Sequence, residues 1–101
     1  VKVQPKPEPT QKTPAKESFP DILADARALM AESDLENALG RYAKLVKKKK
    51  LLEDVIDDLK KASLDHPLNI SIMKTLGDAY MQSDLLDEAL EAYSRAEDLL
   101  T

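Results

Sequence analysis

A group of acidic side chains near the middle of the chain is the densest set of candidate metal or acid–base ligands. Its members recur at a spacing of four residues, which would pair them on the surface of a helix: Glu53, Asp54, Asp57 and Asp58. The chain offers them no cysteine and no nearby histidine, and the glycine-bearing spacing of a calcium loop is missing. Lys60 and Lys61 follow three or four residues later, so we predict ordinary salt pairs along a helix and no metal site.

His66 and the lysine run 47–50 are the other residues whose types suggest chemistry. His66 precedes Pro67 at a predicted turn, and the chain has neither a serine or cysteine nucleophile motif nor a phosphate-binding glycine loop. We therefore expect no catalytic residue and no cofactor site, and we predict that the chain is not an enzyme. The four lysines lack interleaved aromatic residues, which favours a solvated helix C-terminus over a docking patch for an acidic ligand.

The composition of the 101 residues is that of one helical domain with few helix breakers. Residues 1–50 carry 11 basic and 7 acidic groups, whereas residues 51–101 carry 4 basic and 12 acidic groups. This acidic half argues against nucleic-acid binding and favours a basic or neutral partner. The absence of cysteine slightly favours a cytoplasmic location. Since no run of about 18 apolar residues exists, we expect no membrane insertion.

The first 18 residues differ from the rest in composition, because proline, lysine, threonine and glutamine dominate them. Such a segment cannot bury enough apolar surface to offset the entropy of ordering, so residues 1–18 are predicted to be a disordered or extended linker. We expect this linker to join residues 19–101 to an upstream domain or anchor. A Pro-rich peptide ligand is the alternative interpretation.

Apolar residues recur at helical spacing in five stretches between Pro20 and the end of the chain. Helix starts are predicted at Ser18, at Ser33–Asp34 and at Asn69, and a stop is predicted at His66–Pro67. Ser83–Asp84 marks a further turn. The connections are short, so successive helices should be antiparallel neighbours. No breaker lies in the lysine run, and one long helix from about 35 to 65 is the alternative to two.

Two segments of the chain align with each other at a separation of 51 residues. SDLENALGRYAKL begins at Ser33 and SDLLDEALEAYSRA at Ser83, which pairs Tyr42 with Tyr93 once one residue is inserted. The second segment, with the helix before it, resembles a tetratricopeptide repeat. The residues that carry this resemblance are Met73, Leu76, Gly77, Tyr80, Ala89, Tyr93 and Ala96, with Pro67 at the place of a preceding repeat's closing proline. Gly77 inside a helix costs about 1 kcal/mol relative to alanine, which indicates close helix packing.

The resemblance is specific over residues 70–101 and looser over the preceding part of the roughly 80 residues that it covers. Upstream residues fit either a helix pair followed by a single helix, or a helix at 35–48 shared by two repeats. The resemblance implies an all-α, right-handed superhelical array of about five antiparallel helices that binds a peptide or helix of another protein on its concave face. That face would include residues of the fourth helix: Ser71, Lys74, Thr75, Asp78, Met81 and Gln82.

One subfamily of such repeats clamps a terminal carboxylate with lysine and asparagine side chains. Lys74 matches one role, but Asp78 stands where the asparagine is expected and would repel a carboxylate, so we predict no such clamp.

Three other functions remain open. The first is a structural or oligomerisation domain in which Leu99–Leu100 packs against a second copy, although a monomer or weak dimer is expected. The second is an accessory domain of an upstream enzyme or regulator. The third is a binder of anionic surfaces through its lysines.

Overall fold

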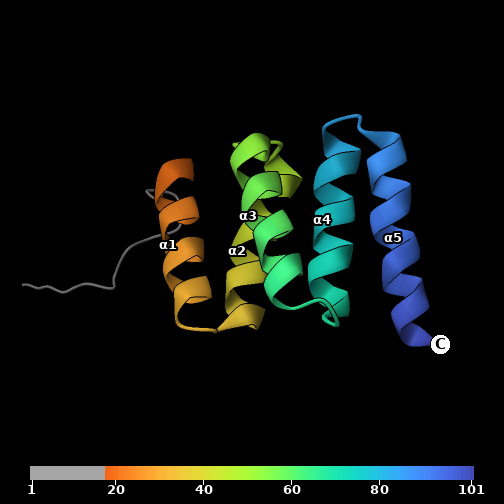
Figure 1. Cartoon of the computed structure of the whole chain (residues 1–101). Helices are drawn as coiled ribbons and strands as arrows, with labels where there is room; N and C mark the ends of the chain where they lie inside the picture. The colour runs from red at the N-terminus through yellow and green to blue at the C-terminus, as the bar shows by residue number, and fades with distance from the viewer. Residues whose placement is uncertain (1–17) are drawn as a thin grey trace, which may run out of the picture.

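Five antiparallel helices stand side by side in the computed structural model, which describes residues 18–101 (Figure 1). The helices are α1 (Phe19–Ala31), α2 (Leu35–Lys48), α3 (Leu52–Asp65), α4 (Ile70–Gln82) and α5 (Leu86–Leu100). The prediction of an all-α array of five helices is confirmed. The predicted linker lies outside the described residues apart from Ser18.

The helix starts follow from local hydrogen bonding. The Ser18 hydroxyl accepts from the Asp21 amide at 3.1 Å, and the Asp21 carboxylate accepts from the Ser18 amide at 3.5 Å, which closes a capping box before Pro20. Asn69 caps α4 by accepting from the Ile72 amide at 3.0 Å. Asp34 precedes α2 as predicted, but its side chain makes no capping bond and instead accepts from the Asn37 side chain at 2.9 Å.

The lysine run ends α2, so the alternative of one helix from about 35 to 65 is wrong. Lys49 adopts a left-handed backbone with φ 58°, and the amides of Lys49 and Lys50 donate to the carbonyls of Val46 and Leu45, each at 3.0 Å. This is the closure with which helices commonly end at glycine. The sequence conceals it because a lysine occupies the left-handed position. Leu51, with φ 53°, is left-handed as well.

The helices pack as two pairs joined by a single helix. α1 packs mainly on α2, and α4 mainly on α5, while α3 and α2 both contact α4. One hydrophobic core runs through all five helices, and its largest fully buried side chains are Tyr42, Leu45, Val55, Leu59, Ile72 and Met73. The sequence left two arrangements open. These contacts favour the one in which a helix pair is followed by a single helix and then by a second helix pair.

Gly77 of α4 packs against the aromatic ring of Tyr93 on α5. A Cβ atom added at Gly77 would lie 2.6 Å from the nearest ring atom of Tyr93, well inside contact distance. The interpretation of this glycine as a packing residue is therefore confirmed. Gly40, the other glycine, faces open space on α2.

The acidic run lies on α3, but its ion pairs differ from those predicted. Arg27 of α1 donates from Nε to Asp58 at 2.7 Å and lies 3.6 Å from Asp54. Lys60 and Lys61 form no ion pair within residues 18–101, so the prediction of salt pairs along α3 is wrong. The reason is tertiary: the acidic face of α3 turns toward α1, where a guanidinium can bind a carboxylate through two nitrogens.

Candidate partner-binding grooves

A groove between α2 and α4 gathers most of the residues predicted to bind a partner. We call it the α2–α4 groove; it has a volume of about 380 Å³ and is lined by Ala43, Val46, Lys47, Thr75, Asp78, Met81, Gln82 and Tyr93. The α2 residues form one wall, the α4 residues form the other, and α5 contributes the Tyr93 ring. The lining combines apolar side chains, such as Val46 and Met81, with polar and charged ones.

The six predicted site residues divide into two sets. Thr75, Asp78, Met81 and Gln82 line the α2–α4 groove, and Met81 is 46% exposed there. Ser71 and Lys74 are exposed on the same helix, but they do not line the groove. Both precede the residues that line it, in the first turns of α4.

Sequence reasoning missed the α2 wall of this groove. Ala43 and Lys47 are exposed on the face of α2 that looks toward α4, and Val46 is buried at the base of the same face. The four-residue spacing of Ala43 and Lys47 places them on one side of a helix, which is a signal available in the sequence. The lysines of the run therefore have different roles. Lys47 lines the groove, and Lys49 takes the left-handed backbone conformation that ends α2. The Nζ atom of Lys50 lies 5.6 Å from the centre of the Phe19 ring.

Opposite charges face each other across the groove. Lys47 supplies a cation on α2, and Asp78 supplies a carboxylate on α4 that accepts a hydrogen bond from the Tyr93 hydroxyl. Burial, and then this hydrogen bond, raise the pKa of Tyr93 to about 12. The hydroxyl therefore keeps its proton at neutral pH and holds the Asp78 side chain in place.

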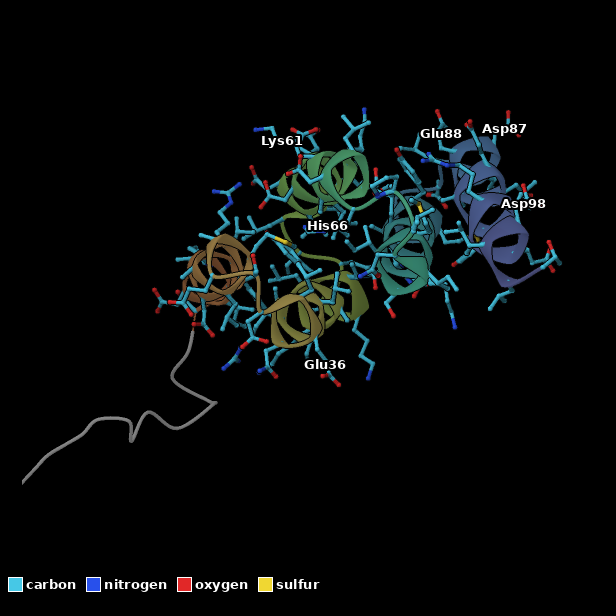
Figure 2. The ribbon with its side chains drawn as sticks, turned by 60° about the horizontal axis from the view of Figure 1, so that its bottom comes forward. Glu36, Lys61, His66, Asp87, Glu88 and Asp98 are labelled. Carbon is cyan, nitrogen blue, oxygen red and sulfur yellow. The ribbon has the colours of Figure 1, made fainter. Side chains whose placement is uncertain are left out.

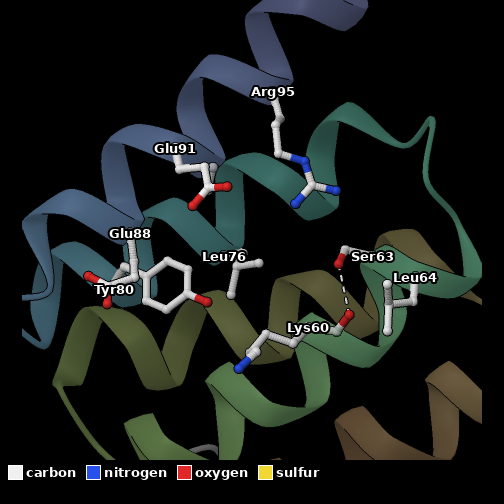
Figure 3. Close-up of a pocket in the computed structure, with 9 residues that line it drawn as sticks. Lys60, Ser63, Leu64, Leu76, Tyr80, Glu88, Glu91 and Arg95 are labelled. Atoms are coloured by element: carbon white, nitrogen blue, oxygen red, sulfur yellow. Dashed lines mark hydrogen bonds between the residues drawn. The ribbon is translucent and has the colours of Figure 1, made fainter.

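A smaller groove, the α3–α5 groove, lies on the other side of α4 (Figure 3). Its volume is about 190 Å³, and its lining is Lys60, Ser63, Leu64, Leu76, Tyr80, Glu88, Glu91, Ala92 and Arg95. The Ser63 hydroxyl donates to the Lys60 carbonyl at 2.7 Å, which turns that hydroxyl back onto its own helix. Burial, followed by the charges of Glu88 and Glu91, raises the pKa of Tyr80. No motif or spacing in the sequence groups these residues.

A third hollow lies between α1 and α2, with a volume of about 460 Å³ and a lining of Asp25, Leu29, Asn37, Gly40, Arg41 and Lys44. An ion pair between Arg41 Nε and Asp25, at 2.8 Å, joins two of the lining side chains. Because these charged groups pair with each other across the two helices, this hollow is a weaker candidate for a peptide than the α2–α4 groove.

His66 and the acidic side chains are the other candidates for metal binding or catalysis. Within residues 18–101, histidine and acidic side chains form no group of three or more that could hold a metal ion. His66 follows the last turn of α3, where its amide donates to the Ala62 carbonyl at 2.8 Å (Figure 2). None of the helices in this part of the chain is long and apolar enough to cross a bilayer.

Comparison with known proteins gives no family for the chain, since no family model, curated protein or solved structure matches it significantly.

Proposed function

We propose that this protein is a tetratricopeptide-like interaction module that binds a peptide or helix of another protein in the α2–α4 groove and catalyses no reaction. One observation carries the proposal. Four residues assigned to the binding face from sequence, Thr75, Asp78, Met81 and Gln82, line a single groove, and a second helix completes its opposite wall.

The chemistry of the groove supports a peptide as its ligand. Met81 and Ala43 offer apolar contact, and Gln82 offers a side-chain amide on the opposite wall from Lys47, whereas the Thr75 hydroxyl donates to the Ser71 carbonyl of its own helix at 2.8 Å. The charges of Lys47 and Asp78 on facing walls would orient a bound segment that carries both signs of charge. Asp78 also disfavours a terminal carboxylate at this point, in keeping with the prediction that no carboxylate clamp is present.

The proposal is tested by selecting peptides from a random phage library on the immobilised protein. Ala43 is exposed on the α2 wall, so Ala43→Glu places a charged side chain in the groove without removing a core contact. Ala28, an exposed alanine of α1 outside the grooves described above, provides a matched Ala28→Glu control. We expect Ala43→Glu to weaken the selected peptides at least tenfold and Ala28→Glu to leave them within about twofold.

Circular dichroism of both variants checks that the helices are retained. Equal binding to the two variants would show that the selected peptides use another surface, and the groove assignment would then be wrong.

A further inference from the structure

One side of α5 carries a seam of mostly apolar side chains that is largely exposed within residues 18–101, although the Tyr93 ring in its middle packs on Gly77 of α4. Its members are Leu86, Leu90, Tyr93, Glu97 and Leu100, at successive spacings of four, three, four and three residues, and we call them the α5 seam. This spacing lines up side chains along one side of a helix, as in the contact between two packed helices. Leu86 is 54% exposed, Leu90 64% and Leu100 70%, whereas Ala89, Ala92 and Ala96 are buried against α4.

The equivalent positions on α2 show that a seam of this spacing can pack against other helices. Fifty-one residues earlier, Leu35, Leu39, Tyr42 and Val46 repeat the same spacing on α2. There the seam is covered: α1, α3 and α4 all contact α2, and Leu39 and Val46 are only 7% and 5% exposed. The equivalent positions on α5, Leu90 and Glu97, are exposed. In one repeat unit the seam is therefore a helix-packing surface, and in the other it is open.

The two aligned tyrosines reflect this difference. Tyr42 donates its hydroxyl proton forward to Asp58 of α3, the helix that follows it, at 2.8 Å. Tyr93 donates back to Asp78 of α4, the helix that precedes it. Within residues 18–101, therefore, the open side of α5 has no contact equivalent to the one that α2 makes with the helix after it.

Charge identifies the kind of helix that fits. Glu97 replaces the Val46 of the covered seam, and Figure 2 shows Asp87 and Asp98 on the side of α5 turned away from α4. The whole of α5 carries five acidic residues and one basic residue, Arg95. A second copy docking through the same face would bring acid against acid, whereas a basic helix would pair with these carboxylates.

We propose that the α5 seam is the docking site for a basic amphipathic helix of a partner protein. The leucines would receive its apolar stripe, and Glu97 would bind a lysine or arginine at its centre. This surface meets the α2–α4 groove only at Tyr93, and its test uses other variants, so either proposal can fail alone.

The probe is a fluorescent 21-residue peptide with leucine at the seam positions of three heptads and lysine and glutamine elsewhere. Its counterpart carries glutamate in place of lysine. In buffer of physiological salt, we expect the lysine peptide to bind and the glutamate peptide to bind at least tenfold more weakly. The double variant Leu86→Ser/Leu90→Ser should weaken the lysine peptide at least tenfold. Leu64, in the α3–α5 groove, and Leu68 are both 78% exposed and belong neither to α5 nor to its seam, so Leu64→Ser/Leu68→Ser is the matched control and should stay within twofold.

Charge reversal provides a second, independent readout. Glu97→Lys should weaken the lysine peptide and strengthen the glutamate peptide, and amide shifts in a nuclear magnetic resonance titration should centre on residues 86–100. The proposal is overturned if the control double variant loses as much affinity, if the glutamate peptide binds equally well, or if the lysine peptide does not bind. It is also overturned if light scattering shows a dimer that Leu86→Ser/Leu90→Ser dissociates, since the occupant would then be a second copy.

Discussion

The hydroxyl of Tyr42 donates a hydrogen bond of 2.8 Å to the carboxylate of Asp58, which also binds Arg27 at 2.7 Å. Three helices meet in this cluster, since Arg27 belongs to α1, Tyr42 to α2 and Asp58 to α3. Tyr42 is 1% exposed, and burial, with the Asp58 bond second, raises the pKa of its hydroxyl. The hydrogen bond with Asp58 raises the pKa of Arg27 in turn. The cluster therefore fixes the single helix α3 against the first helix pair.

Removing Asp58 should destabilise the fold much more than removing a surface partner. Asp58→Ala leaves the Tyr42 hydroxyl buried without an acceptor, and we expect a loss of about 2–3 kcal/mol in the free energy of unfolding. The matched control is Asp25→Ala, which breaks the Arg41 pair between side chains that are 37% and 42% exposed and should cost less than about 1 kcal/mol. Urea unfolding followed by circular dichroism measures both. Equal losses would mean that the cluster contributes no more than a surface ion pair.

Gly77→Ala should destabilise the protein although alanine is the better helix former. The substitution gains about 1 kcal/mol in helix propensity. Its methyl group, however, would lie 2.6 Å from the Tyr93 ring, which must move and give up its bond to Asp78. We expect a net loss of about 1–3 kcal/mol in thermal or urea unfolding.

A double-mutant cycle isolates the cause. In a Tyr93→Ala background the obstructing ring is gone, so Gly77→Ala should then stabilise α4 by about 1 kcal/mol. If Gly77→Ala had the same effect in both backgrounds, the ring contact would not be the reason for the glycine.

Much of this fold follows from local sequence, and the differences lie where tertiary contacts decide. Ser18 and Asn69 could be predicted as helix starts because a cap depends on residues only three positions away. Gly77 inside a helix indicated close packing, but the same signal at Gly40 of α2 marks no contact, so the sequence alone does not distinguish the two glycines. The Arg27–Asp58 contact spans 31 residues, and no local pattern could have selected it over Lys60 and Lys61.

The candidate site shows the same division. Four of the six predicted α4 residues line one groove because a spacing of three and four residues places them on one side of that helix, whereas the α2 wall depends on how α2 and α4 pack. The end of α2 at Lys49 could not be predicted, because the residue with the left-handed backbone is a lysine rather than a glycine.

That left-handed lysine gives a further prediction. A residue with a Cβ in this conformation costs roughly 1–2 kcal/mol, and glycine removes the cost at the expense of greater freedom in the unfolded chain. Lys49→Gly should therefore raise the free energy of unfolding by about 0.5–1 kcal/mol. Lys48→Gly, one residue earlier and inside the last turn of α2, should lower it, and thermal melts of the two variants give the comparison. Stabilisation by neither variant would contradict the assigned helix end.

Tyr93, partly buried and hydrogen-bonded to Asp78, should make the free energy of unfolding depend on pH in the alkaline range. The pKa of Tyr93 is raised to about 12 in the folded protein, first by burial and then by Asp78, whereas its ordinary value is 10.0. The folded state therefore keeps a proton that the unfolded state releases. The resulting stabilisation is fully present below pH 10 and is lost as the pH rises toward 12.

Comparison with Tyr93→Phe separates this effect from the titration of lysines, because both proteins share every other group. The difference in their free energies of unfolding should be constant from pH 7 to about 9.5 and should then shift against the wild type up to about pH 12. Urea unfolding at a series of pH values measures it, and the near-ultraviolet absorbance of tyrosinate follows the same proton directly. Asp78→Asn keeps an acceptor for the hydroxyl but removes the charge, so it should lower the pKa of Tyr93 only in part, because burial is the larger cause. A difference between the two proteins that did not change with pH would show that Tyr93 releases its proton equally easily in the folded and unfolded states, and that its bond to Asp78 does not hold the groove wall in place.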